Sequence, residues 1–118
     1  MKILLVEDNA IMRRMLRAML DPAIAVVEAT NGEEGVAQIK AQSDITLILT
    51  DFNMPRMNGV QMVEIVRKEC PNFQGKFVFT SSVRDKAIFD KAAELGVSSW
   101  LHKPFKKEEL TAIVNKFK

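Results

Sequence analysis

The sequence predicts an α/β fold in which one parallel β-sheet is covered by helices on both faces. Three observations lead to this prediction. Short apolar runs of strand length alternate along the chain with segments whose apolar residues recur at helical spacing. Each apolar run ends in acidic, hydroxyl, proline or glycine residues that are typical of loops. Strict alternation favours parallel neighbours, because parallel strands need crossover connections and their apolar faces need cover.

Three strands and two helices are expected in the first half of the chain. Aliphatic residues from Lys2 to Val6 predict the first strand, which stops at Glu7 and Asp8. Apolar residues recur at helical spacing from Ala10 to Leu20, and the methionines among them are expected to fill core. Asp21-Pro22 ends that helix. The later elements of this half are a strand at Ile24–Glu28, a helix that follows the turn Thr30-Asn31-Gly32 and carries Val36 and Ile39, and a strand at Thr46–Thr50.

Three helices and two strands are expected in the second half. A helix at Val60–Val66 is closed by Cys70-Pro71, because proline cannot continue a helix. A helix from about Asp85 to Leu95 ends at Gly96, as glycine at a C-cap predicts. The remaining elements are a strand at Lys76–Phe79 that stops at Thr80-Ser81-Ser82, a strand at Val97–Leu101 that stops at Lys103-Pro104, and a helix at Lys107–Phe117.

The composition is that of an ordinary globular domain. The 118 residues are 47% hydrophobic and 27% charged, which is enough to bury one core, so residues 1–118 are expected to form one domain. A single cysteine, Cys70, excludes an internal disulfide. No apolar stretch has the length of a membrane span or a signal peptide core, which predicts a soluble cytoplasmic protein. The formal net charge of +2 gives no indication of nucleic-acid binding.

Polar groups follow four of the five expected strands. Glu7 and Asp8 follow the first strand, Asp51 the third, Thr80 the fourth and Lys103 the fifth. Each of them alone is explained as a cap, a turn residue or a solvated side chain. In a parallel sheet, however, the carboxyl ends of the strands meet at one edge. Together these residues therefore predict a functional site.

The residue types at this edge favour phosphoryl transfer. Three crowded carboxylates repel one another and take up protons unless a cation joins them. Oxygen ligands without histidine or cysteine select a hard ion, and Mg²⁺ is the best candidate. An aspartate that attacks phosphorus, a lysine that offsets negative charge and a threonine hydroxyl complete the set. The sequence has no glycine-rich phosphate loop, so a nucleotide is not expected as the donor.

Four sequence motifs carry a resemblance to a known family. They are LLVEDN at the first strand, LILTDFNMPRMNG at the third, FVFTSS at the fourth and WLHKPF at the fifth. Over its whole length the chain resembles the receiver domain of bacterial two-component response regulators. It is most similar to the stand-alone chemotaxis regulators, a likeness to which MRRMLR in the first helix adds. The resemblance implies a flavodoxin-like fold with sheet order 2-1-3-4-5, and a monomeric signalling protein rather than an enzyme.

The resemblance also implies roles for individual residues. Asp51 is expected to be the phosphoacceptor, which takes its phosphoryl group from the phosphohistidine of a histidine kinase or phosphotransfer domain. Asp8 and Asp51 are expected to bind Mg²⁺ directly, together with the backbone carbonyl of Asn53. Glu7 is expected to assist through metal-bound water. Glutamate in place of aspartate is common at this position of the family.

A phosphoryl-binding pair and a switch pair are implied as well. Thr80 and Lys103 are expected to contact phosphoryl oxygens, and Lys103-Pro104 corresponds to the family's cis peptide bond. Thr80 and Trp100 form the switch pair, which alters the face made by the fourth helix, fifth strand and fifth helix and so its affinity for a downstream effector protein. The family usually has Tyr or Phe in place of this larger Trp. The alternative is that Trp100 is a partly exposed packing residue.

Other polar residues receive weaker assignments. Asn53 and Ser82 occupy positions that tune hydrolysis of the acyl phosphate in the family. His102, the only histidine, is expected to be a surface neighbour of Lys103. The arginines of the first helix either contact a kinase's phosphotransfer domain or form a solvated face; they are Arg13, Arg14 and Arg17.

Alternative functions share some of these sequence features. Within the family, the alternatives are a phosphorelay intermediate and a receiver excised from a DNA-binding regulator. A phosphohydrolase with an aspartate nucleophile needs a second aspartate two residues on, where this chain has Asn53. A flavodoxin-like cofactor binder needs a phosphate loop after the first strand, where the acids Glu7 and Asp8 would repel an anion.

Overall fold

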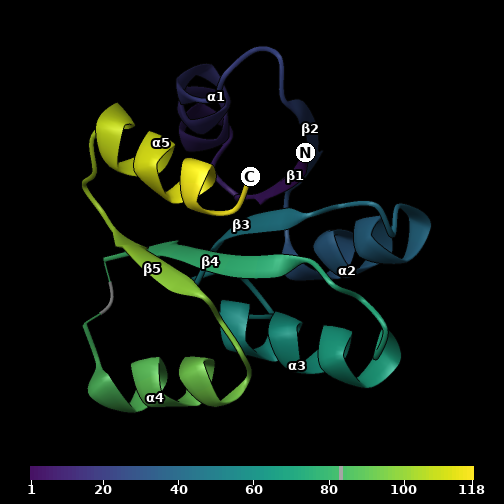
Figure 1. The fold of residues 1–118 in the computed structure, drawn as a ribbon. Coiled ribbons are helices and arrows are strands. Elements are labelled where there is room, and N and C mark those ends of the chain that lie inside the picture. Colours follow the sequence, from purple (N-terminus) through teal and green to yellow (C-terminus); the bar gives the residue numbers. More distant parts are fainter. Residues whose placement is uncertain (83) are drawn as a thin grey trace.

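The computed structural model describes residues 1–82 and 84–118, in which five strands alternate with five helices (Figure 1). The sheet order is β2-β1-β3-β4-β5 with every pair parallel, so the predicted flavodoxin-like α/β fold is confirmed. None of the described helices has the length and apolar character needed to cross a bilayer. The strands are Lys2–Val6 (β1), Ala25–Ala29 (β2), Leu47–Asp51 (β3), Lys76–Ser81 (β4) and Ser99–His102 (β5), and the helices are Ala10–Met19 (α1), Gly32–Ala41 (α2), Gly59–Glu69 (α3), Lys86–Glu94 (α4) and Lys107–Lys116 (α5).

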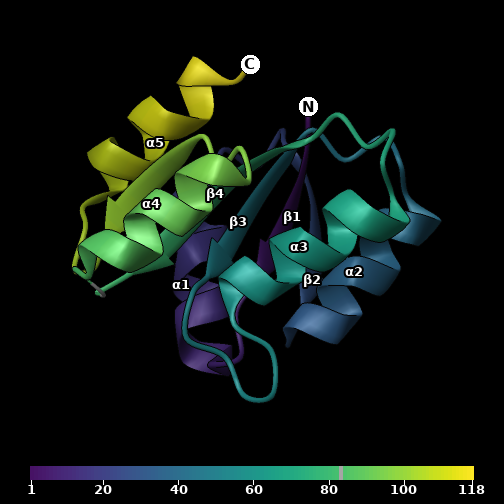
Figure 2. The same ribbon diagram turned by 90° about the horizontal axis from the view of Figure 1, so that it is seen from below.

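The helices form a layer on each face of the sheet. In Figures 1 and 2, α1 and α5 cover one face, and α2, α3 and α4 cover the other. Alternating side chains of a strand point to opposite faces, so Ile3 and Leu5 of β1 pack in the core under α1 and α5, whereas Leu4 and Val6 pack in the core under α2, α3 and α4. Every residue of β3 is buried, as expected for a central strand covered on both sides.

Short polar side chains start four of the helices. Asn9, Asn31, Asn58 and Asp85 are N-caps whose side chains accept hydrogen bonds from backbone amides of the first turn. The cap of α1 follows the end of β1 closely, whereas the cap of α3 comes after the longer loop 52–57. At Gly59, the first residue of α3, an added Cβ would lie 3.2 Å from the Asp51 carbonyl oxygen. The sequence therefore brings α3 close against the end of β3.

Several predicted strand boundaries were displaced by one or two residues. Strand β3 includes Asp51, and β4 extends to Ser81, because the ladder continues to pair Asp51 with Thr80. Strand β5 begins at Ser99 rather than Val97, because the Val97 amide donates to the Ala92 carbonyl at 3.0 Å and closes the end of α4. Asp51 is thus part of a strand and not the first residue of a loop.

The prediction for the apolar residues of α1 was partly wrong. Leu16 is buried and Met12 and Met19 are partly buried, but Ile11 is 70% exposed and Met15 is 48% exposed. Apolar residues occupy more of the circumference of this helix than one contact with the sheet can cover. Ile11 and Met15 are four residues apart and so share a helix face, which remains in solvent beside the carboxyl ends of the strands.

Candidate functional site

Three carboxylates converge at the carboxyl ends of β1 and β3. One carboxylate oxygen from each of Glu7, Asp8 and Asp51 lies within 4.8 Å of the others. Glu7 is 2% exposed and Asp51 is 8% exposed, whereas Asp8 is open to solvent. The convergence follows from the topology, because β1 and β3 are parallel neighbours and end at the same edge of the sheet.

Lys103 reaches this cluster from the loop after β5. Its Nζ lies 3.3 Å from Asp51 Oδ2 and 3.5 Å from Glu7 Oε2. The backbone amide of Lys103 donates to the Ser81 carbonyl at 3.0 Å, and the peptide bond to Pro104 is cis. One ammonium group therefore faces two buried carboxylates.

The electrostatics of the cluster favour an additional cation. Burial raises the pKa of the Glu7 carboxyl, and the negative charges of Asp51 and Asp8 raise it further. The Lys103 ammonium and the Asn9 amide act in the opposite direction. A hard divalent cation would relieve this excess of negative charge, and carboxylate oxygens are its preferred ligands. The residues present at this edge therefore fit Mg²⁺.

Hydroxyl and amide groups surround Asp51. Thr80 is buried on β4 and pairs with Asp51 in the strand register. The Asn53 backbone amide donates to Asp51 Oδ1 at 3.2 Å, and the Asn53 side chain is exposed. Ser82 follows the end of β4 and is also exposed. The phosphoryl-binding and hydrolysis-tuning residues predicted from the sequence thus lie on the elements that border the acids.

Trp100 belongs to a group of packed aromatic rings. Its ring centroid is 4.5 Å from that of Phe89, 5.1 Å from Phe79 and 6.1 Å from Phe52. Phe52 directly follows Asp51, and Phe79 directly precedes Thr80. The indole Nε1 of Trp100 is buried without a hydrogen-bond partner among the described residues. Ring packing therefore connects Phe52 and Phe79, which adjoin Asp51 and Thr80 in the chain, to α4.

The prediction that His102 is a surface neighbour of Lys103 was only partly right. Its side chain is half-buried, and its ring centroid lies 5.7 Å from Phe89 and 6.2 Å from Trp100. Within the described part of the chain, Nδ1 is buried and has no hydrogen-bond partner. The reason is the period of a strand: β5 extends to His102, so residues 100 and 102 point to the same face.

A charged network next to the acids was missed by the sequence analysis. Arg13 Nε lies 3.1 Å from Glu28 Oε1, and Arg13 Nη1 donates to the Glu7 carbonyl at 2.7 Å. Arg17 also pairs with Glu28, which lies on β2. Two arginines of α1 are thus bound to the neighbouring strand rather than simply solvated. An acid near the end of the strand that neighbours β1 is the signal that could have indicated this contact.

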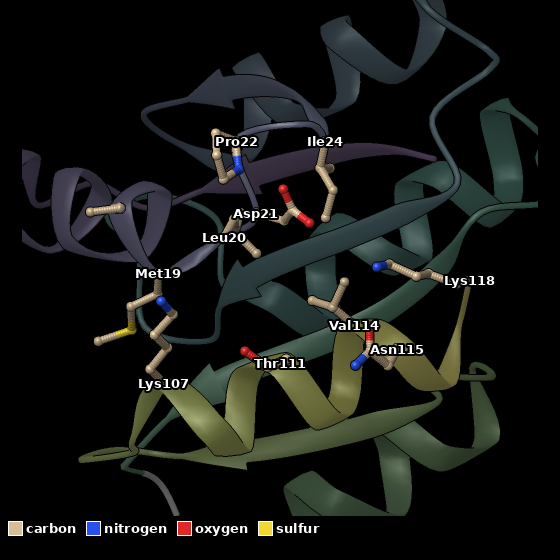
Figure 3. A pocket seen from close by; sticks show the side chains of 11 residues that line it. Met19, Leu20, Asp21, Pro22, Ile24, Lys107, Thr111, Val114, Asn115 and Lys118 are labelled. Carbon is tan, nitrogen blue, oxygen red and sulfur yellow. The ribbon is translucent and has the colours of Figure 1, made fainter.

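A pocket of about 430 Å³ lies away from the acids, between the end of α1, the following loop and α5 (Figure 3). Figure 3 shows Lys107 and Lys118 toward opposite ends of it, and apolar side chains such as Ile24 and Val114 between them. None of the site residues predicted from the sequence lines it. The carboxylate edge is therefore the candidate functional site.

The fold and this site define the class of protein. A family model for the response regulator receiver domain matches residues 3–115, and the chain therefore belongs to the response regulator receiver family. Members of this family are signalling proteins rather than classical enzymes, interact with histidine kinases and effectors, and generally bind Mg²⁺ at an acidic pocket.

The chain is similar to individual proteins of this family. The chemotaxis protein CheY1 of Helicobacter pylori is 32% identical over 112 residues, which cover 93% of this chain and 90% of that protein. The solved structure of the Vibrio cholerae chemotaxis protein CheY4 has a TM-score of 0.88 and 26% identity, and the match covers 99% of this chain and 98% of that one. The hybrid signal transduction histidine kinase D of Dictyostelium discoideum is 37% identical over 95% of this chain but over only 7% of the kinase.

Proposed function

We propose that residues 1–118 form one receiver domain that accepts a phosphoryl group on Asp51 from a phosphohistidine of a kinase or phosphotransfer domain, with Mg²⁺ as cofactor. The observation that carries this proposal is the convergence of Glu7, Asp8 and Asp51, with Lys103 Nζ 3.3 Å from Asp51 Oδ2. The chain catalyses only its own phosphorylation and dephosphorylation and is not otherwise an enzyme.

The transfer itself is a displacement at phosphorus. An Asp51 carboxylate oxygen forms the new P–O bond while the P–N bond to the partner's histidine breaks, and the electron pair of that bond stays on the imidazole nitrogen. Lys103 exchanges its contact with the free carboxylate for one with a phosphoryl oxygen, and the Thr80 hydroxyl donates to another. Mg²⁺ held by the acids at this edge would supply positive charge to offset that of the transferred group. Asn53 and Ser82 set the access of water to the acyl phosphate.

The metal ligands follow from the acids that converge. Asp8 and Asp51 would hold Mg²⁺ through side-chain oxygens and Asn53 through its backbone carbonyl, whereas Glu7 would act through metal-bound water. The crowding of Glu7, Asp8 and Asp51 supports this set, because a divalent cation would offset the negative charge that the three carboxylates share.

The phosphotransfer partner is proposed to dock on the exposed face of α1. Ile11 and Met15 are exposed there, and an apolar pocket of about 320 Å³ lies between α1 and the loop after β5. Met15, Lys103 and Phe105 are among the residues that line this pocket. Because Lys103 contacts Asp51, a partner that covers this pocket brings its phosphohistidine to the acceptor.

The output is proposed to pass through Thr80 and Trp100 to the face formed by α4, β5 and α5. A Thr80 hydroxyl drawn toward the phosphoryl group changes the packing next to Phe79, on which Trp100 rests at 5.1 Å. Rearrangement of the contact between Trp100 and Phe89 then alters α4 and its affinity for an effector protein. Matches along about 90% of the length of chemotaxis proteins favour motility control as the output.

A second candidate is a phosphorelay receiver. The 37% identity with a segment of a hybrid histidine kinase favours it, because that match covers 95% of this chain. A phosphotransfer profile separates the two: a relay receiver passes its phosphoryl group on to a second histidine domain, whereas a stand-alone regulator loses it to water.

Phosphorylation by a small-molecule donor tests the proposed function. Incubation with acetyl phosphate and Mg²⁺ should add the mass of one phosphoryl group to the intact chain, and removal of Mg²⁺ with EDTA should prevent the addition. Asp51→Asn should abolish it, because an amide cannot be the acceptor. The matched control Asp44→Asn, at an exposed acid paired with Lys2, should react like the wild type. A wild-type chain whose mass does not change would reject the proposal.

A further inference from the structure

The charged network between α1 and β2 reaches the backbone that carries the acids. Arg13 contacts Glu28 through Nε at 3.1 Å and the Glu7 carbonyl through Nη1 at 2.7 Å. We propose that Arg13 is a positioning residue that holds the Glu7-Asp8 backbone in the arrangement that binds Mg²⁺. This inference rests on the metal site of the proposed function and adds to it a residue that touches no metal ligand's side chain.

The bond from Arg13 takes the place of a missing bond of the sheet. The Glu7 amide donates to the Ala29 carbonyl at 3.1 Å, which continues the pairing of β1 with β2 by one residue. In a continued parallel ladder, the Glu7 carbonyl would accept from the amide of Asn31. Asn31 instead starts α2 as its N-cap. The guanidinium of Arg13 supplies the donor that the diverging strand no longer offers.

The guanidinium is itself held in place. Glu28 accepts from both Arg13 and Arg17, and the Arg13 side chain is only 19% exposed. The planar fork of an arginine allows Nε and Nη1 to reach a carboxylate and a carbonyl at the same time. Strand β2 therefore fixes the donor, and the donor fixes the end of β1.

The Glu7 carbonyl, which accepts the bond from Arg13, belongs to the residue directly before Asp8. The peptide unit that contains the Glu7 carbonyl also contains the Asp8 amide and is planar, so its orientation sets the direction in which Asp8 leaves the strand. On the other side, the Asn9 amide lies 3.4 Å from Glu7 Oε1, and the Arg13 amide donates to the Asn9 carbonyl at 2.9 Å. The Arg13 side chain thus holds the start of the short segment between β1 and α1, and the first backbone hydrogen bond of α1 holds its end.

Charge and positioning predict opposite effects of removing Arg13. A positive charge beside a cation site repels the cation, so loss of the arginine should tighten Mg²⁺ binding if only its charge matters. Its loss also leaves the Glu28 carboxylate with one partner fewer, which acts in the same direction. If Arg13 positions the acids, its loss should weaken Mg²⁺ binding. The sign of the change therefore separates the two roles.

Calorimetric titration of the full chain with Mg²⁺ measures that sign. Arg13→Ala should weaken binding by about tenfold, the size typical of groups that orient metal ligands. Arg13→Lys keeps the charge but has no planar fork, and should bind with intermediate affinity. Arg14→Ala removes one positive charge from the same helix and leaves the bonds of Arg13 to Glu28 and Glu7 in place. It should bind Mg²⁺ as tightly as the wild type or slightly more tightly.

Thermal unfolding of each variant is measured without Mg²⁺ and identifies variants that do not fold. If Arg13→Ala does not fold, the Mg²⁺ affinity of Arg13→Lys decides the test. Unchanged or tighter Mg²⁺ binding by the folded Arg13 variants would overturn the inference, and so would equal weakening in all of the arginine variants. These results leave the metal site of the wild type intact. A wild-type chain that binds no Mg²⁺ rejects the metal site itself, and the positioning role with it.

Discussion

The two flanks of the carboxylate site are held by different forces. On the charged flank, formed by Arg13, Arg17 and Glu28, both arginines pair with Glu28, and Arg13 also donates to the Glu7 carbonyl, directly after β1, at 2.7 Å. On the aromatic flank, formed by Phe52, Phe79, Phe89, Trp100 and His102, the contacts are between rings, and two buried nitrogens have no partner among the described residues. Directional bonds permit one geometry, whereas ring packing permits several. The charged flank is suited to fixing ligands and the aromatic flank to transmitting a change.

The largest effect on stability is expected on the aromatic flank. Phe79 is fully buried at the centre of the rings, so Phe79→Ala should lower the free energy of unfolding by about 4 kcal/mol through lost burial and the cavity left behind. Phe89→Ala, at the half-buried rim, should lower it by about 1 to 2 kcal/mol. Urea denaturation measures both. Equal losses at the two positions would contradict a packed centre with a loose rim.

A smaller effect is expected at Glu7, and it depends on pH. Burial and neighbouring acids raise the pKa of Glu7 in the folded chain above its ordinary value of 4.5. The folded state therefore holds this proton more tightly than the unfolded state, and the resulting stability is present below pH 4.5 and is lost as the pH rises through the folded pKa. Without Mg²⁺ at neutral pH, Glu7→Gln should stabilise the chain by about 1 kcal/mol.

The control for this prediction is Glu69, because the Lys40 ammonium holds its pKa below the usual value. Glu69→Gln should have the opposite sign at neutral pH, with a slight loss of stability, and should not respond to Mg²⁺. Denaturation of both variants between pH 4 and pH 8 gives the free energy of unfolding as a function of pH for each of them. The range brackets the ordinary pKa value of 4.5. A Glu7→Gln chain that is less stable than the wild type in Mg²⁺-free buffer would contradict the described charge imbalance.

The smallest effect is expected when Trp100 is replaced by another aromatic residue. Trp100→Phe keeps a ring against Phe79 and Phe89 while it removes a buried N–H that has no partner in the described part of the chain. Lost packing and relieved desolvation offset each other, so the free energy of unfolding should change by less than about 1 kcal/mol. Trp100→Ala removes the ring and should cost about 3 kcal/mol. A loss of similar size in Trp100→Phe would contradict the expected offset between lost packing and relieved desolvation.

The convergence of the three carboxylates could be predicted from the sequence better than the contacts of the residues around them. Glu7, Asp8 and Asp51 could be placed together because parallel strands end at one edge, whatever the details of packing. The packing of His102 beside Trp100 was not predicted, although the period of a strand would have indicated it. The bond from Arg13 to Glu7 could not be predicted from helical periodicity, because it depends on which face α1 turns to the sheet and on the neighbouring β2. The exposure of Ile11 and Met15 depends on the same rotation of α1.

The most direct measurement of the central claim locates the phosphoryl group. After reaction with acetyl phosphate and Mg²⁺, borohydride reduces an acyl phosphate to an alcohol, and tandem mass spectrometry of the digested chain identifies the residue that carries it. The account predicts reduction at Asp51 alone, absent without Mg²⁺ and lost in Asp51→Asn. Reduction at Glu7 or Asp8 instead, or at Asp51 to the same extent without Mg²⁺, would contradict it.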